Sequence, residues 1–152
     1  MTKRIVFKFS AYVVLMLRDG DKILVLKRSN TGFDDDRYAF PGGQLDGNER
    51  IFDAVIREAR EELGITLKTE DLKLVHTRHV RRDSIESIGF FIEARAWSGQ
   101  IQNMEPHKHA LVEWVSINRL PYTILQSDKM VLDFVERRIA FSDWGFDNNK
   151  LS

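Results

Sequence analysis

The stretch GGQLDGNERIFDAVIREAREELGI, residues 42–65, joins a glycine-rich segment to a helical pattern of apolar residues. At about 100° per residue, the apolar positions fall on one narrow stripe, which predicts an amphipathic helix. These positions are Phe52, Ile56, Ala59 and Leu63. Asn48 is the predicted N-cap, and Gly64 is the predicted left-handed residue that ends the helix.

Like charges gather on one side of this helix. Five of the eight residues 56–63 are charged, and Glu58, Glu61 and Glu62 lie beside the apolar stripe, with Glu62 nearest to it. Shielded carboxylates repel one another unless one takes up a proton or a cation sits among them. Two interpretations stay open: the three carboxylates hold a hard divalent cation such as Mg²⁺, or they form a solvated face whose neighbouring arginines make surface ion pairs.

The composition is that of one globular domain, residues 1–152, with 43% hydrophobic residues. Basic and acidic residues are equal at 23 each, so no net charge attracts nucleic acid polymers or anionic membranes. The absence of cysteine excludes disulfides, zinc–thiolate sites and thiol nucleophiles, and it agrees with a cytoplasmic location. The longest apolar run, residues 11–17, is far shorter than a membrane helix and predicts a buried strand.

The remaining patterns alternate between strand and helix. A turn at 18–21 joins two strands, the polar segments 30–37 and 98–109 are loops, and the tail 142–152 is expected to be ordered in part through Trp144 and Phe146. The predicted strands cover 4–17, 22–29, 38–40, 73–80, 87–97 and 110–117, and a second helical period covers 123–141. This order predicts a mixed α/β (α+β) domain with helices packed on the faces of a sheet.

The spacing of fixed residues from Gly43 to Ile65 resembles the Nudix hydrolase signature, Gly-x5-Glu-x7-Arg-Glu-U-x-Glu-Glu-x-Gly-U, in which U is bulky and apolar. Every fixed position is met, and Ala59 is small for a U position. The segments FPGG before the helix and EWVSINRLP near the end also look like this family. The resemblance implies the Nudix fold, a mixed β-sheet between helices.

The resemblance also implies roles for single residues. Gly43 would allow close backbone approach to the substrate, and Arg57 would pair with Glu49 to orient the helix. The cofactor would be Mg²⁺ or Mn²⁺, and the substrate a small molecule with a diphosphate linkage. The implied metal ligands are Glu58, Glu61, Glu62 and the carbonyl of Gly42.

Hydrolysis needs a general base to remove a proton from the attacking water. Glu61 or Glu62 could serve from the helix, or the base could come from the loop 98–109, with Glu105 as first candidate and then His107 and His109. The alternative is that Glu105 and the proline after it only shape a turn. Two histidines in strand-like runs are expected to be structural or exposed: His76 and His79.

The substrate is predicted from what residues 66–105 lack. They contain neither the proline typical of ADP-ribose hydrolases nor the tyrosine typical of dinucleoside polyphosphate hydrolases. We therefore expect the substrate to be a nucleoside triphosphate, either canonical or oxidised, that is cleaved to the monophosphate and pyrophosphate. The protein is expected to be a monomer or a homodimer. The alternatives are a nucleotide sugar, another diphosphate compound, or a non-catalytic module that senses nucleotides.

A base pocket could be bordered by Phe33, Asp35 and Tyr38, since nucleobases stack on aromatic faces and aspartate accepts from exocyclic amines. Alternatively, Tyr38 belongs to the core, and the aspartate run 34–36 is a solvated loop. Three arginines either reach terminal phosphates or lie at a solvated hairpin end: Arg78, Arg81 and Arg82.

Overall fold

The computed structural model describes residues 7–146, which form eight strands, two α-helices and one short 3₁₀ helix. In chain order the elements are β1 (Ser10–Asp19), β2 (Lys22–Arg28), β3 (Tyr38–Ala39), β4 (Gly42–Gln44), α1 (Ile51–Leu63), η1 (Thr69–Asp71), β5 (Leu72–Arg82), β6 (Ile85–Ala94), β7 (His109–Ser116), α2 (Gln126–Glu136) and β8 (Phe141–Trp144).

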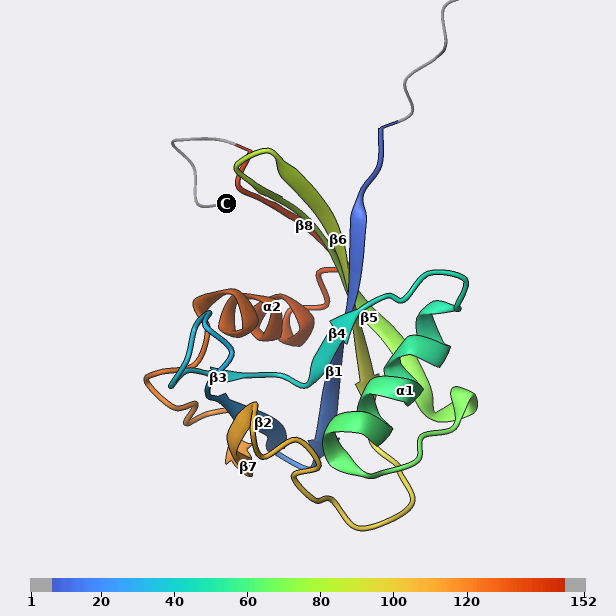
Figure 1. Ribbon diagram of the computed structural model, residues 1–152, viewed down its shortest axis with the longest axis vertical. Helices are drawn as coiled ribbons and strands as arrows, with labels where there is room; N and C mark the ends of the chain where they lie inside the picture. Colours follow the sequence, from blue (N-terminus) through green and yellow to red (C-terminus); the bar gives the residue numbers. More distant parts are fainter. Residues whose placement is uncertain (1–6, 147–152) are drawn as a thin grey trace, which may run out of the picture.

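The strands form one mixed sheet in the order β3-β2-β1-β6-β5-β8, with β4 paired to β1 and β7 paired to β2. The pairs β1·β6 and β5·β8 are parallel, and the others are antiparallel. Helices α1 and α2 lie on opposite sides of β1 (Figure 1). The predicted mixed α/β class, with a sheet between helices, is confirmed.

Strand β1 is buried on both faces because it lies between the helices. Successive side chains of a strand point to opposite faces, so Val13 and Leu15 pack in the core under α1, while Val14 and Met16 pack in the core under α2. An apolar run of this kind has no alternation of polar residues and is typical of a central strand. Burial on both sides therefore fixes β1 as the frame that holds the two helices.

Helix α1 ends as predicted but begins later than predicted. Gly64 adopts the left-handed conformation with φ 68°, and its N–H donates to the carbonyl of Arg60. The N-cap is Arg50 rather than Asn48, which has a positive φ of 55° in the preceding loop. The assignment of Asn48 was wrong because the side chain of Glu49, two residues before α1, ties this loop by accepting the N–H of Asp46 at 2.8 Å.

Helix α2 is shorter than the predicted span 123–141. The N–H of Tyr38 donates to the carbonyl of Thr123, and the N–H of Leu125 donates to the carbonyl of Tyr38. These residues therefore extend alongside β3 instead of joining the helix. At the other end, Arg138 has a positive φ of 59°, which stops the helix.

Two short strands were not predicted. The glycines of β4 have low strand propensity, yet residues Gly42–Gln44 pair with β1. Strand β8, inside the polar tail, pairs with β5 at one edge of the sheet. Trp144 belongs to this strand, and the ring of Phe146 lies 4.4 Å from that of His79, so both aromatic residues order the tail as expected. Residues 4–6 and 147–152 of the predicted segments lie outside the described residues.

Within residues 7–146, neither helix has the length and apolar character needed to cross a membrane.

Strand β4 depends on the absence of a side chain at Gly42. A Cβ atom there would lie 2.2 Å from the carbonyl oxygen of Val13, and φ is +152°. We expect Gly42→Ala to break the β1·β4 pairing and to lower the free energy of unfolding by about 2 kcal/mol or more. Gly20→Ala is the matched control, since its φ of +58° imposes backbone strain while its Cβ meets nothing within 4 Å. Equal losses in urea denaturation of the two variants would contradict the prediction.

Candidate functional site

Two of the three helix glutamates face the interior of the protein. Glu58 and Glu62 are buried, and Glu62 is only 5% exposed, whereas Glu61 lies at the surface. Residues four positions apart lie one turn above each other, so Glu58 and Glu62 present their carboxylates to the same region. The prediction that Glu62 is shielded is confirmed, and a fully solvated face is excluded for this pair.

Strand β4 brings its backbone against these two carboxylates. The N–H of Gly42 donates to Oε2 of Glu62 at 2.9 Å. At Gly43, a Cβ atom would lie 2.2 Å from Oε1 of Glu58, so only glycine leaves room for this carboxylate. The close backbone approach expected at Gly43 is present, and the roles of both glycines toward a ligand stay predictions.

Arg57 connects the helix to the loop before it. Its guanidinium donates to both carboxylate oxygens of Glu49, at 3.1 and 2.8 Å, and to the carbonyl of Gln44 at 3.1 Å. The same group donates to Glu58 at 2.7 Å and to Glu61 at 3.2 Å. The hydrogen bonds from Arg57 hold the pKa of Glu49 below its usual value. The expected Arg57–Glu49 pair is therefore present, and it also fixes two carboxylates of α1.

The carboxylates carry the electrostatic cost of burial. Burial raises the pKa of Glu62 to about 8, and the Gly42 N–H opposes this shift only in part. Burial also raises the pKa of Glu58, although its hydrogen bond with Arg57 lowers it. Glu62 therefore holds a proton near neutral pH unless a cation takes the place of that proton.

The loop between β6 and β7 adds a third buried group. Glu105 and His109 reach Glu62, and one ligand atom from each of the three lies within 4.8 Å of the others. His107 is exposed, while His109 is buried. Lys108 binds Glu105 at 2.8 Å. The structure thus brings two of the three candidates from this loop, Glu105 and His109, to the helix carboxylates.

These side chains fit a divalent cation. Glu58, Glu61, Glu62 and Glu105 offer carboxylate oxygens, which suit Mg²⁺ and Mn²⁺, and His109 offers a ring nitrogen. Burial raises the pKa of Glu58 and Glu62, so additional positive charge beside them would favour their ionised forms. A dication would supply this charge.

A cavity of about 660 Å³ opens beside β4. Gly42 and Gly43 line it together with residues of β1, of the hairpin β5–β6 and of the first turn of α2. Aromatic walls come from Phe33, Phe40 and Trp144. The volume and the mixture of aromatic and polar walls are typical of small-molecule sites.

Two buried polar side chains lie in the wall of this cavity. Arg78 is 2% exposed and donates to the carbonyl of Ser127 at 3.1 Å, while its Nε finds no partner among residues 7–146. Asp128 accepts the N–H of Phe40 at 2.8 Å. Burial raises the pKa of Asp128 to about 6 and lowers the pKa of Arg78.

The sequence interpretation missed Asp128 and misplaced Arg78. A solvated hairpin end was wrong for Arg78 because β5 pairs with β6 on one side and β8 on the other, which buries this residue inside the sheet. Asp128 lies three and four positions before Val131 and Leu132, on the buried stripe of α2. A charged residue on an apolar stripe is the signal that could have identified it.

The predicted base-binding residues divide between two places. Phe33 lines the cavity, whereas Asp35 and Tyr38 are not among its lining residues in the described chain. Asp35 accepts the backbone N–H of Thr31 at 3.0 Å and so closes its own loop. Tyr38 binds Glu113, and this hydrogen bond, with burial, raises the pKa of Tyr38 to about 12. Asp35 is therefore engaged within its own loop, and Tyr38 is engaged by a residue of β7, so both side chains have partners outside the cavity.

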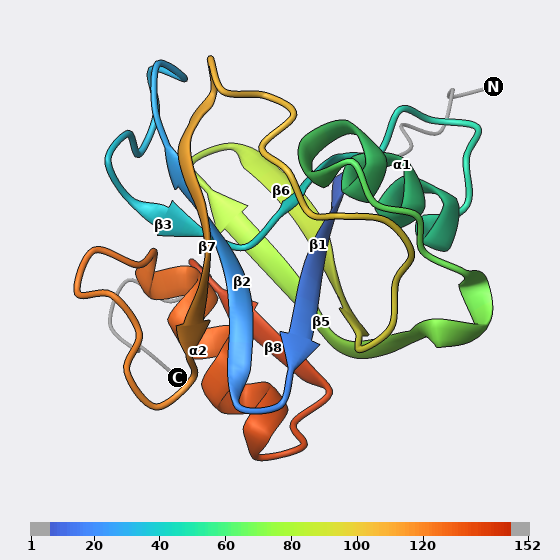
Figure 2. The same cartoon turned by 90° about the horizontal axis from the view of Figure 1, so that it is seen from below.

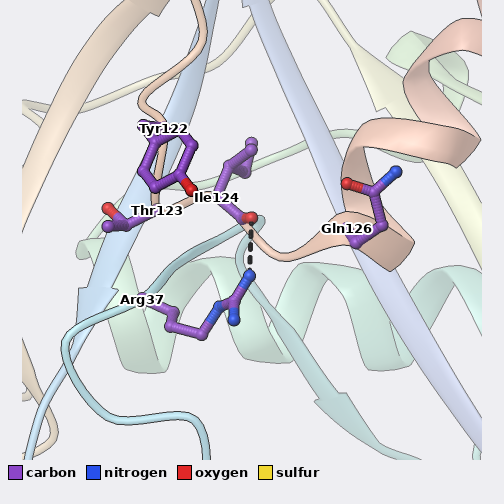
Figure 3. A pocket seen from close by; sticks show the side chains of 5 residues that line it. All are labelled: Arg37, Tyr122, Thr123, Ile124 and Gln126. Atoms are coloured by element: carbon purple, nitrogen blue, oxygen red, sulfur yellow. Dashed lines mark hydrogen bonds between the residues drawn. The ribbon is translucent and has the colours of Figure 1, made fainter.

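A smaller cavity of about 280 Å³ lies beside β3 and is separate from the carboxylates. Figure 3 shows its five lining side chains, with Arg37 donating to the carbonyl of Ile124 at 3.2 Å. None of its lining residues belongs to the carboxylate cluster.

The two strand histidines have structural partners, as expected. Both ring nitrogens of His76 are hydrogen-bonded at 2.8 Å, one to the carbonyl of Ile139 and the other to Oγ of Ser142. His79 contacts Glu86 at 2.8 Å. Neither is a member of the carboxylate cluster in the described residues.

Comparison with known proteins places this arrangement among related chains. Residues 7–134 match the family model described as the NUDIX domain. The chain is similar to an ADP-ribose pyrophosphatase of Methanocaldococcus jannaschii, with 30% identity over 79% of this chain and 69% of that protein. It is also similar to a CTP pyrophosphohydrolase of Escherichia coli, with 31% identity over 81% of this chain and 88% of that protein.

The fold is similar to that of a MutT NUDIX hydrolase from Burkholderia pseudomallei, with a TM-score of 0.75 and 24% identity over 84% of this chain and 98% of that one.

A methyl group at position 43 would displace the carboxylate of Glu58 without a backbone clash, because the atoms it meets belong to a flexible side chain. We expect Gly43→Ala to weaken binding of Mn²⁺ by roughly tenfold while the melting temperature stays near that of the parent. Titration calorimetry and thermal unfolding measure the two effects. Gly47→Ala, where a Cβ meets nothing within 4 Å, is the control. Unchanged Mn²⁺ affinity in Gly43→Ala would contradict the expectation.

Asp128 makes stability depend on pH. Its pKa of about 6 in the folded protein is above the ordinary value of 3.8, so folding favours the protonated acid, and the folded protein loses stability as pH rises from about 4 to about 6. Asn at position 128 keeps an acceptor oxygen for Phe40 but does not titrate.

We therefore expect the unfolding free energy of the parent, minus that of Asp128→Asn, to fall by about 3 kcal/mol between pH 4 and pH 7. Urea denaturation across this range measures the difference. A difference that does not change with pH would show that Asp128 titrates normally.

Proposed function

This chain belongs to the Nudix family and is a hydrolase that acts on pyrophosphate bonds, and from this premise we propose that it cleaves a nucleoside triphosphate to the monophosphate and pyrophosphate with a divalent cation.

One observation carries the proposal: the carboxylate cluster and the cavity share the backbone of β4. Gly42 and Gly43 contact Glu62 and Glu58, and both glycines also line the cavity. A nucleotide with its base in the cavity would therefore place its phosphates beside the carboxylates. This arrangement suits a substrate in which a nucleoside and a diphosphate are joined directly.

The walls of the cavity suit a nucleobase. The rings of Phe33, Phe40 and Trp144 offer faces for stacking. Asp128 and Arg78 supply an acid and a guanidinium, which can bond to the polar edge of a base. A buried polar group that would be left without a partner discriminates strongly between ligands, so these two residues are our candidates for base selection.

The residues of the cluster divide the work of hydrolysis. A bound dication would neutralise negative charge on the diphosphate oxygens and would lower the pKa of a water molecule bound to it. Arg57, held by Glu49, keeps the carboxylates of Glu58 and Glu61 in place. Glu61 is exposed to solvent, whereas Glu58 and Glu62 are buried. We therefore assign to Glu61 the uptake of the proton from the attacking water.

The relatives support two substrate classes. The E. coli protein is a CTP pyrophosphohydrolase, which supports a nucleoside triphosphate. The M. jannaschii protein is an ADP-ribose pyrophosphatase, which favours ADP-ribose as a second candidate. Both compounds are nucleoside diphosphates with a further group, and both fit the shared glycine backbone of cluster and cavity.

Removal of one charge from the cluster tests the site. We expect Glu61→Gln and Glu62→Gln each to lower the release of nucleoside monophosphate in Mg²⁺ by about 100-fold or more, since each removes either the proton acceptor or a buried ligand. Glu70→Gln, at an exposed position in η1, is the matched control and is expected to keep full activity. Thermal unfolding verifies that each variant is folded.

The assay covers canonical and oxidised nucleoside triphosphates, ADP-ribose, nucleotide sugars and dinucleoside polyphosphates, with Mg²⁺ and with Mn²⁺. Full turnover in folded Glu62→Gln protein would refute the proposed site. Faster cleavage of ADP-ribose than of any triphosphate would replace the proposed substrate with the second candidate. Tight binding without turnover across the set would indicate a nucleotide sensor.

A further inference from the structure

The loop between β6 and β7 is anchored at the end of α1. The N–H of Met104 donates to the carbonyl of Glu62, and the N–H of Gln102 donates to the carbonyl of Leu63, both at 3.0 Å. The last carbonyls of a helix lack partners within the helix, so the loop satisfies them. Figure 2 shows this loop running past α1 on its way to β7. The position of Glu62 is thus tied directly to the loop.

A closed turn directs two side chains of this loop to Glu62. The N–H of His109 donates to the carbonyl of Glu105 at 3.0 Å. The side chain of Asn103 bridges the turn, because it accepts the N–H of Glu105 at 3.2 Å and donates to the carbonyl of His109 at 2.7 Å. These bonds hold Glu105 and His109 on the same side, with ligand atoms within 4.8 Å of each other and of a carboxylate oxygen of Glu62.

The imidazole of His109 lacks the partners that a buried ring normally has. It is 6% exposed, its Nδ1 has no hydrogen bond among the described residues, and its Nε2 lies 3.6 Å from Oε1 of Glu62. This distance is too long for a hydrogen bond, and unsatisfied buried nitrogen is costly. The ring therefore offers a cation a nitrogen that no hydrogen bond of the described residues occupies.

The ammonium group of Lys108 lies near the cluster, but it does not prevent a cation from binding there. Lys108 binds Glu105 at 2.8 Å, but its side chain is half exposed, and an exposed ion pair contributes only about 0–1 kcal/mol. A dication held by buried ligands can therefore displace this ammonium group or share Glu105 with it.

We propose that Glu62, Glu105 and His109 form a mixed nitrogen–oxygen site that binds a later first-row dication, such as Co²⁺ or Zn²⁺, in preference to Mg²⁺. Mg²⁺ prefers oxygen ligands, whereas imidazole nitrogen suits the later transition metals, so the histidine determines the choice of metal. The inference rests on the proposed function only in that the two share Glu62.

Metal binding to the full chain, freed of metal by a chelator, tests the proposal without any substrate. We expect His109→Gln to weaken Co²⁺ binding by roughly tenfold or more and to alter the visible absorption of bound Co²⁺, while Mg²⁺ affinity changes by about threefold or less. His107→Gln makes the same substitution at an exposed position of the same loop, and it should change neither quantity. Unchanged Co²⁺ binding in His109→Gln, or equal losses in both variants, overturns the proposal.

A second measurement uses the unsubstituted protein and so does not depend on the folding of a variant. Zn²⁺ should shift the side-chain ¹⁵N resonance of one ring nitrogen of His109 in NMR spectra, and no shift overturns the proposal. If Mg²⁺ supports hydrolysis but neither Co²⁺ nor Zn²⁺ contacts His109, the proposed function holds and the nitrogen–oxygen site is refuted. Contact with His109 but no cleavage of any diphosphate compound would leave only the metal site.

Discussion

The burial of two carboxylates against bare backbone is the constraint on which the rest of this structure depends. Glu58 and Glu62 are held between α1 and β4, where Gly42 donates a hydrogen bond and Gly43 leaves space that a side chain would fill. Burial without full charge compensation raises the pKa of both acids, and a fold keeps such a cost when the site has a use for it. The cluster is therefore a candidate site for positive charge that comes from outside the chain.

The surrounding elements serve this cluster in different ways. Arg57 donates to Glu49, to the carbonyl of Gln44 and to two carboxylates of α1, so it connects the loop before the helix to the helix itself. The sheet supplies the rigid frame, because β1 is buried on both faces and pairs with β4 directly. The proposed cation and diphosphate site is thus framed by backbone that is paired in the sheet.

The cavity beside β4 gives the cluster its context. It draws on β1, the hairpin β5–β6 and the start of α2, which are far apart in the chain. Arg78 and Asp128 are buried there with few partners, and this makes their wall of the cavity sensitive to the polar edge of a ligand. Among the described residues, Gly42 and Gly43 belong to the cavity and also contact the carboxylate cluster, so the proposed base selection and the proposed cation site meet at these two glycines.

Local patterns determined α1, its end at Gly64, the central strand β1 and the spacing that identifies the family, because each is a matter of period or of a fixed distance along one helix. The pairing of Arg57 with Glu49 was implied by the family resemblance, and the structure contains it. The tertiary structure alone decided that Asp128 faces a cavity, that Arg78 is buried, and that Tyr38 bonds to Glu113 of β7, since each depends on segments that are distant in sequence. The meeting of Glu62, Glu105 and His109 belongs to this second group, because it requires a long loop to fold back onto the end of a helix.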